Sequence, residues 1–310
     1  MARIQRSALH STAYTYFEAV ARLGSVRKAA AELFVVPSAV SHQIAVLEEE
    51  LGISLFSRLP KGLQLSSAGE MLLYHGRRGV AELERGRSFV ASLTGLQTGT
   101  TSLATVEGVA VGPVSQTLAK FWARWPAIRV GVSIGSSDRA FDAVDSGEAE
   151  LGLSYAKPDS PKVTVLAQAE LRVGAIFRAD HPLANSKTLK VRELMDAGLP
   201  LLLADRSIEI RQMLEHAIGK DALRLLPRLD TNSVMVMSQL AKSGAGVAVK
   251  TRIGIEDELA RKELVFVPLR ELATAKQRLL FFTRQDTRLA PAAAALAENL
   301  TAMVLALHER

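Results

Sequence analysis

The chain has 310 residues, of which 48% are hydrophobic, and a net charge of +6 that permits a polyanionic partner. It contains no cysteine, which excludes disulfides, thiolate catalysis, cysteine metal sites and thiol redox sensing. Its six histidines lack metal-ligand spacing, and no apolar run approaches the roughly 18–20 residues of a membrane span. The first residues lack the apolar segment of a signal peptide. We therefore expect a cytoplasmic protein that needs no metal, no cofactor and no membrane.

The pattern of expected secondary structure changes once along the chain. Residues 12–93 have helical patterns, and a Gly- and Thr-rich stretch follows at 94–102. Beyond this stretch, short apolar strands alternate with helical patterns, which favours mainly parallel sheets of the α/β class. We predict a helical domain at 1–66, a long linker helix at 67–95 and an α/β domain at 96–310.

The segment VPSAVSHQIAVLEEELG (36–52) predicts a helix with a polar face that is free to meet a partner. Pro37 suits the first helical position, and Gly52 suits the end of the helix. At 100° per residue, one apolar stripe contains Val40, Ile44, Leu47 and Leu51. The side facing away from it carries Ser38, His42 and Ala45, with Ser41 on the flank. No second group is placed to orient His42 for catalysis, so this face favours reading of the DNA major groove.

The preceding segment predicts the first half of a helix-turn-helix. Ser25 is a good N-cap, but Arg27 and Lys28 follow in the first turn, where cations oppose the helix dipole by roughly 0.3–1 kcal/mol each. They are either a solvated pair or contacts to DNA phosphates. The short turn at 34–36 joins the two helices and favours the phosphate contacts.

An alternating segment after residue 52 predicts a two-stranded wing. It turns at 60–62 and places Arg58 and Lys61 at its tip, where both can contact phosphate. The predicted DNA-binding residues are Arg27, Lys28, Pro37, Ser38, Ser41, His42, Gln43, Arg58 and Lys61.

A heptad-like seam with alternating spacings of four and three runs along residues 67–93. Three of its seven positions are glycine, and each glycine costs about 1 kcal/mol relative to alanine inside a helix. Either a loosely packed helix tolerates them, or the missing side chains let the helices of two subunits approach closely. The seam ends at Leu93, and the residues predicted for dimerisation are Leu72, Gly76, Gly79, Leu83, Gly86 and Val90.

The stretch from Phe17 to Glu70 resembles the LysR-type transcriptional regulators through its Ala-Ala pair and the pattern PSAVS.QI..LE..LG..LF.R. The resemblance continues through 135–155 and 229–249 and covers nearly the whole chain. It implies an N-terminal winged helix-turn-helix, a linker helix that dimerises, and a C-terminal α/β effector-binding domain of two subdomains, like those of periplasmic binding proteins. Subdomain I would comprise 101–168 and 276–310, and subdomain II 173–271.

One position departs from the family pattern. Many members have arginine where this chain has His42, so its recognition helix contains no Lys or Arg. Phosphate affinity would then depend on the helix N-terminus and on Arg27, Lys28, Arg58 and Lys61. His42 contacts either a base or a phosphate.

The resemblance places an effector in the cleft between the two subdomains. Ligands of open α/β sheets gather at strand C-terminal ends and helix N-termini. Turns of this kind occur at 111–116, 134–139, 203–207, 230–234 and 248–252. Their hydroxyls and cations favour a small organic anion, although each serine is alternatively an ordinary helix N-cap. The predicted effector-binding residues are Ser115, Ser136, Ser137, Ala204, Arg206, Asn232, Ser233 and Lys250.

Three functions compete for these features. The resemblance implies a ligand-responsive regulator that reads a palindromic promoter site in double-stranded DNA as a homodimer or homotetramer, and it allows for contact with RNA polymerase. The alternative of an α/β enzyme with a helical appendage lacks GxSxG, P-loop, GxGxxG and metal-cluster motifs. A solute-binding protein would need an export signal, and none is found. We therefore expect a regulator and not an enzyme.

Overall fold

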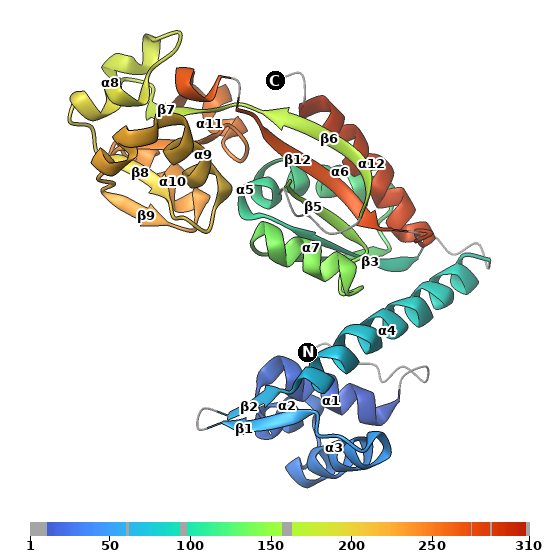
Figure 1. The fold of residues 1–310 in the computed structure, drawn as a ribbon. Helices are drawn as coiled ribbons and strands as arrows, with labels where there is room; N and C mark the ends of the chain where they lie inside the picture. The colour runs from blue at the N-terminus through green and yellow to red at the C-terminus, as the bar shows by residue number, and fades with distance from the viewer. Residues whose placement is uncertain are drawn as a thin grey trace. The chain divides into compact units, whose positions relative to one another are not determined.

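The computed structural model describes residues 11–59, 62–93, 98–156, 163–273, 275–285 and 287–307. The chain divides into two compact units, which are Met1–Arg87 with Ser146–Glu148 and Ser88–Asp145 with Ala149–Arg310 (Figure 1). The first unit contains the predicted helical domain and most of the linker helix. The second unit contains the α/β domain.

Three helices and a two-stranded wing open the first unit. They are α1 (Thr12–Leu23), α2 (Val26–Leu33), α3 (Pro37–Leu51), β1 (Phe56–Leu59) and β2 (Gly62–Leu65). The two strands pair antiparallel, as a wing requires.

Local capping fixes the ends of these helices. Ser25 accepts a hydrogen bond from the backbone N–H of Lys28 at the start of α2. Gly24 and Gly52 adopt the left-handed conformation that ends α1 and α3. Pro37 is the first residue of α3, where its missing N–H removes no intrahelical bond. The caps predicted at Ser25, Pro37 and Gly52 are therefore confirmed.

A small apolar core joins the three helices. Its buried residues are Tyr16, Phe17, Ala19, Val20, Ala29, Ala30, Val40 and Ile44. Only the first half of the predicted α3 stripe belongs to it, since Leu47 is half-buried and Leu51 is 47% exposed. The prediction that Leu51 lies in the core is wrong, because the core includes α3 only as far as Ile44.

The long helix α4 (Ser67–Leu93) packs closely against its own unit through two glycines. A Cβ atom at Gly69 would lie 2.2 Å from the carbonyl oxygen of Leu55, and one at Gly76 would lie 2.0 Å from Cε2 of Tyr14. Gly76, which we predicted at a dimer interface, therefore serves a contact inside the chain. The seam pattern could not separate these two uses of a small residue.

The later seam positions are open to a partner. Leu83 is 45% exposed and Val90 is 65% exposed. Apart from the neighbouring backbone of α4 itself, a Cβ atom at Gly79 or Gly86 would meet no atom of the described residues within 4 Å. Leu72, near the start of the helix, is half-buried. Among the seam positions, the exposed part therefore begins at Gly79.

The second unit contains two five-stranded sheets, with strand orders β4-β3-β5-β12-β6 and β11-β7-β10-β8-β9. We call the part around the first sheet subdomain I and the part around the second subdomain II. The first sheet is built from β3 (Gly99–Thr105), β4 (Ile128–Ile134), β5 (Leu151–Tyr155), β6 (Val163–Leu171) and β12 (Gln277–Arg284). The second sheet is built from β7 (Val173–Arg178), β8 (Leu201–Ala204), β9 (Leu229–Thr231), β10 (Val247–Thr251) and β11 (Leu264–Pro268).

Parallel and antiparallel pairs are equally frequent in both sheets. β3 pairs parallel with β4 and β5, whereas β12 pairs antiparallel with β5 and β6. β8 pairs parallel with β9 and β10, whereas β7 pairs antiparallel with β10 and β11. The prediction of mainly parallel sheets is therefore wrong in part. The chain passes between the subdomains before β7 and again before β12, and these connecting strands run against their neighbours.

Helices cover both faces of the first sheet (Figure 1). α6 (Ser115–Arg124) and α12 (Pro291–Leu307) bury their apolar residues against one face, and α7 (Ser137–Asp145) covers the other. A short helix α5 (Glu107–Val109) and a π-helical turn (Ala110–Val114) lead into α6. This arrangement brings the first turns of α5 and α7 to the ends of the parallel strands.

The second sheet is covered in the same way. α8 (Val191–Asp196) and α9 (Glu209–Ile218) pack on one face, and α10 (Val234–Lys242) and α11 (Glu256–Ala260) pack on the other. Short 3-10 turns lie at Pro182–Asn185, Gly219–Arg224 and Arg270–Leu272. The first turns of α9 and α10 follow strands β8 and β9 directly, so they lie at the strand ends where ligands of such sheets bind.

In the described part of the chain, no single helix is long and apolar enough to cross a membrane. Helices α2 and α3 reach the length and hydropathy of a membrane span only when they are taken together, and the chain bends by 112° at the turn between them. Their buried apolar residues belong to the core of the first unit.

In α4, Gly76 packs against Tyr14 whereas Gly79 is open, so substitution by alanine should have opposite effects at the two positions. Gly76→Ala should lower the free energy of unfolding by about 1–3 kcal/mol, because the new methyl group displaces the Tyr14 ring. Gly79→Ala should raise it by up to about 1 kcal/mol, because alanine has the higher helix propensity and the site is open. Thermal and denaturant unfolding measure both effects. Equal melting temperatures for the two variants would contradict these separate roles of the two glycines.

Candidate nucleic-acid interface and ligand cavity

The N-terminal half of α3 presents a polar face to solvent. Ser38, Ser41 and His42 are exposed and Gln43 is half-buried, while Val40 and Ile44 anchor the opposite side. Short side chains at the start of an exposed helix leave room for the edges of bases in a major groove. The face therefore has the exposure and the hydrogen-bonding groups that base reading requires.

The start of α3 also has free capacity for an anion. Its N-cap residue is Val36, whose side chain cannot accept a hydrogen bond from the first-turn N–H groups. Pro37, which is exposed, has no N–H to satisfy. The remaining N–H groups and the positive end of the helix dipole favour a phosphate oxygen at this point.

Four cations near α3 were predicted to contact phosphates, and two of them have described side chains. Arg27 and Lys28 are exposed in the first turn of α2, and within the described residues neither forms an ion pair with a carboxylate. Arg58 lies on β1 opposite Leu63 of β2, although its side chain is not described. Lys61 lies outside the described residues. The exposed pair on α2 is available to phosphates.

An exposed aromatic side chain whose exposure was not predicted lies in the turn before this helix. Phe34, in the turn between α2 and α3, is 84% exposed and has a left-handed backbone with φ of 56°. This conformation is uncommon for a bulky residue. The sequence signal was weak, because an aromatic residue in a turn next to an apolar helix end is ordinarily assigned to the core.

A cavity of about 330 Å³ lies between the two subdomains of the second unit. Five of the eight residues predicted for the effector line it, from the starts of α7 and α10 and the end of β10. They are Ser136, Ser137, Asn232, Ser233 and Lys250. Three of the predicted turns, at 134–139, 230–234 and 248–252, therefore contribute residues to one cavity.

Three predicted residues do not line this cavity. Ser115 donates its hydroxyl to the carbonyl groups of Val111 and Gly112 in the π-helical turn that precedes α6. Ala204 is 2% exposed within the core of subdomain II. The Arg206 side chain is 78% exposed, and its Nε lies 3.3 Å from Oε1 of Glu215. The structure does not bring these three residues to the cavity, because a turn position fixes the backbone but not the direction of the side chain.

Glu107 occupies the position that we expected an external anion to take. Its carboxylate accepts hydrogen bonds from Oγ of Ser233 at 2.9 Å and from the backbone N–H of Met235 at 3.2 Å. Glu107 comes from α5 of subdomain I, and both donors belong to the start of α10 in subdomain II. A carboxylate of the chain itself therefore caps α10 across the cavity.

The connecting strand β12 contributes a second polar link that sequence reasoning missed. Gln277 donates from Nε2 to Oε2 of Glu209 at 3.1 Å, which joins β12 to the first turn of α9. The Oε1 atom of Gln277 is buried and has no hydrogen-bond partner in the described part of the chain. A donor group brought into the cavity would remove the cost of that unsatisfied oxygen.

Tyr155, on the same wall, remains a hydrogen-bond donor at all physiological pH values. Burial raises the pKa of its hydroxyl to about 12, and the nearby carboxylates of Glu209 and Glu256 add to this effect. A hydrogen bond with Thr251 opposes the shift without cancelling it. The cavity therefore combines hydroxyl donors with the two carboxylates of Glu107 and Glu209.

Lys250 is buried, with an exposed fraction of 2%, and already has protein partners. Its ammonium group donates to Oγ of Ser238 at 3.1 Å and to the carbonyl oxygen of Ile253 at 2.9 Å. Burial lowers the pKa of Lys250 to about 8, while the carboxylates of Glu256, Glu258 and Glu107 oppose this shift. Two carboxylates and this one lysine line the cavity, so the lining does not favour a simple anion throughout.

No group of three or more His, Cys, Asp or Glu side chains in the described ranges could hold a metal ion.

Two family models match this chain. "Bacterial regulatory helix-turn-helix protein, lysR family" matches residues 12–70, and "LysR substrate binding domain" matches residues 94–304. The RuBisCO operon transcriptional regulator of Allochromatium vinosum is 27% identical over 95% of this chain and 96% of its own length. A probable nitrogen assimilation transcriptional activator of Synechococcus elongatus is 28% identical over 88% of both chains.

Solved structures show the same fold. Full-length OxyR from Pseudomonas aeruginosa has a TM-score of 0.65 at 16% identity and covers 94% of this chain and 95% of its own. Full-length CbnR in complex with its target DNA has a TM-score of 0.62 at 19% identity and covers 94% of this chain and 98% of its own. The predicted helix-turn-helix and α/β effector domain are confirmed. These matches are to regulators, which agrees with the expectation that the chain is not an enzyme.

The burial of Lys250 predicts a rise of stability with pH. The folded chain releases this proton near pH 8, whereas the unfolded chain releases it near 10.5, so the unfolded chain binds more protons between these values. The free energy of unfolding should therefore rise from pH 8 toward pH 10, by about 1–2 kcal/mol. Tyr155 acts in the opposite direction above pH 10, since its pKa is raised from 10 to about 12.

Lys250→Met should remove that rise, because methionine has no proton to release. Denaturant unfolding at a series of pH values from 7 to 10 measures the slope for both chains. A slope that is the same in the variant and the natural chain would show that Lys250 is not its source.

Proposed function

Because the chain belongs to the LysR family of bacterial transcriptional regulators, we propose that it reads a palindromic promoter site and changes its DNA binding when a small molecule enters the cavity between the subdomains. The exposed polar face of α3 carries the DNA-reading part of this proposal. The protein would act in the cytoplasm, where promoter DNA and RNA polymerase are accessible.

A homodimer is the assembly that this function needs. Two copies related by a two-fold axis present two recognition helices to the two halves of a palindrome. The exposed seam of Gly79, Leu83, Gly86 and Val90 supports dimerisation through α4, because two glycines allow close approach and two apolar residues gain burial. A homotetramer would follow from a second contact between such dimers.

The effector that best suits the cavity is a small organic acid that also carries a hydrogen-bond donor group. Its acid group would bind at the first turn of α7, beside Ser136 and Ser137. An amino or hydroxyl group at its other end would approach Glu209 and Gln277. The α10 end already holds the Glu107 carboxylate, so a second anion there would meet repulsion.

The two kinds of DNA contact predict separable effects. Arg58→Ala should flatten the dependence of log affinity on log salt by about 0.9, because one phosphate contact is lost. Ser38→Ala and His42→Ala should instead alter sequence preference, because these side chains face bases. Gel-shift titration with the DNA upstream of the chain's own gene, at several salt concentrations and against random DNA, measures both.

Arg192→Ala is the matched control, since it removes an exposed cation of the second unit that pairs with Asp196. Equal losses on specific and random DNA for His42→Ala would assign this side chain to a phosphate. A salt dependence that changes as much in Arg192→Ala as in Arg58→Ala would contradict the role of the wing.

The effector proposal predicts stabilisation by a defined class of ligand. Amino acids and hydroxy acids should raise the melting temperature more than simple carboxylates of equal size, because only they supply a donor for Gln277 and Glu209. The double variant Ser136→Ala/Ser137→Ala should lose this response. Ser115→Ala should keep it, because the hydroxyl of Ser115 bonds in the described chain only to the adjoining π-helical turn and does not line the cavity. Stabilisation by neutral or cationic ligands alone would contradict an acid group at α7.

A further inference from the structure

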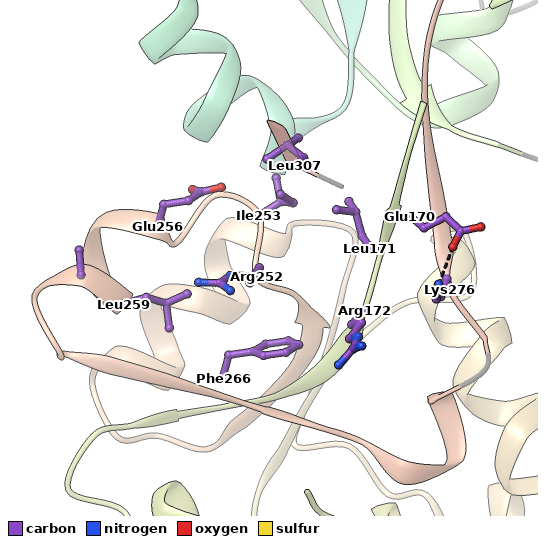
Figure 2. A pocket seen from close by; sticks show the side chains of 11 residues that line it. Glu170, Leu171, Arg172, Arg252, Ile253, Glu256, Leu259, Phe266, Lys276 and Leu307 are labelled. Carbon is purple, nitrogen blue, oxygen red and sulfur yellow. Dashed lines mark hydrogen bonds and ion pairs between the residues drawn. The ribbon is translucent and has the colours of Figure 1, made fainter. Parts of the chain in front are cut away.

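A second, larger cavity of about 610 Å³ lies where the chain crosses between the subdomains. Figure 2 shows its lining side chains, which come from the crossing at Glu170–Arg172, the segment 252–260, Phe266, Lys276 and the end of α12. It shares one lining residue, Ile253, with the cavity described above. The two cavities are therefore separate spaces divided by a common wall.

The walls of this hinge cavity are largely apolar. Phe266 and Leu259 are half-buried, and three further apolar residues are buried. The buried residues are Leu171 at 5%, Ile253 at 2% and Leu307 at 6% exposure. Such walls would gain about 25 cal/mol for each Å² of apolar ligand surface removed from water. The cavity suits a molecule with an apolar, planar or branched body.

The charges around these walls favour an anion. Arg172, Arg252 and Lys276 line the cavity together with Glu170 and Glu256, which gives a net charge of +1. Both acids already accept hydrogen bonds, Glu170 from Lys276 at 2.6 Å and Glu256 from the N–H of Gly254 at 2.9 Å. The cavity beside α10 has the opposite balance, since two carboxylates face one lysine.

Arg172 and Arg252 line the cavity together with the aromatic side chain of Phe266. In the view of Figure 2, the side chain of Phe266 lies between those of Arg172 and Arg252. Arg172 is exposed, so its side chain can turn toward a ligand without disturbing the core. Arg252 is half-buried and lines the same cavity. Planar guanidinium groups bind carboxylate and phosphate oxygens with two parallel hydrogen bonds.

We propose that this hinge cavity is a second ligand site, which binds an organic anion with an apolar body between Arg172, Arg252 and Phe266. Its walls come from both subdomains, because Leu171 and Leu307 belong to subdomain I and Phe266 to subdomain II. A ligand there binds best at one angle between the subdomains. That angle also sets the shape of the first cavity, so the two sites influence each other reciprocally.

Calorimetric titration of the full chain with 1-naphthoate and 1-naphthyl phosphate tests the site itself. The expected result is binding of at least one of these anions and much weaker binding of the neutral 1-naphthalenemethanol. The anion that binds with the higher affinity shows whether the site prefers a carboxylate or a phosphate. Arg172→Gln should weaken binding about tenfold, which equals about 1.4 kcal/mol. Ala260→Trp should block binding, because the new ring fills the cavity from an exposed position.

Two matched variants serve as controls for charge and for the first cavity. Arg206→Gln removes a cation that lines neither cavity and should leave the affinity unchanged. Ser136→Ala/Ser137→Ala alters the first cavity only and should also leave it unchanged. The proposal is overturned if neither anion binds, if affinity follows the serines instead of Arg172, or if the neutral alcohol binds equally well.

The effect of the second ligand on DNA binding rests on the proposed function, and it is measured in a separate experiment. Saturating naphthoate should change the affinity of the natural chain for its upstream DNA. The DNA affinity of the Ala260→Trp variant should be the same with and without naphthoate. Unchanged DNA affinity despite calorimetric binding would overturn the regulatory part alone. Absence of specific DNA binding without any ligand would count against the proposed function and would leave the calorimetric result standing.

Discussion

The hydrogen bonds of the Glu107 carboxylate to Ser233 and Met235 are the interaction on which the effector domain depends. They join the first helix of subdomain I to the start of α10 in subdomain II, across the space where a ligand would bind. The carboxylate in this position accepts the N–H of Met235 in the first turn of α10 and links the two subdomains directly. Any ligand that enters the cavity must accommodate this link or break it.

Close contacts between backbones hold the same region together. A Cβ atom at Gly254 would lie 2.7 Å from the carbonyl oxygen of Gly108, and one at Gly112 would lie 2.8 Å from Cα of Gly254. The π-helical turn Ala110–Val114 begins directly beside these contacts. Unusual helix geometry of this kind is frequent at functional sites. The link through Glu107 is thus supported by a surface on which larger side chains would not fit.

Features set by neighbouring residues could be predicted from the sequence. Ser25, Pro37 and Gly52 act through contacts within one helical turn, and the inward and outward sides of the first half of α3 follow from its period. Features that depend on distant residues could not. Glu107 and Ser233 are separated by 126 positions, and Gly76 looks like a seam residue until Tyr14 is placed against it. The side-chain direction of Arg206 depends on Glu215, which the pattern of turns does not include.

Ile253 lies in the wall between the two cavities, which constrains how this protein can diverge. A larger or smaller side chain at this position alters the volume of both spaces at once, so neither ligand preference can drift freely at this point. Its carbonyl group also holds the ammonium group of Lys250. New specificity in such a chain should therefore arise at residues that line one cavity only, and comparisons among relatives should find this position more restricted in size than its neighbours.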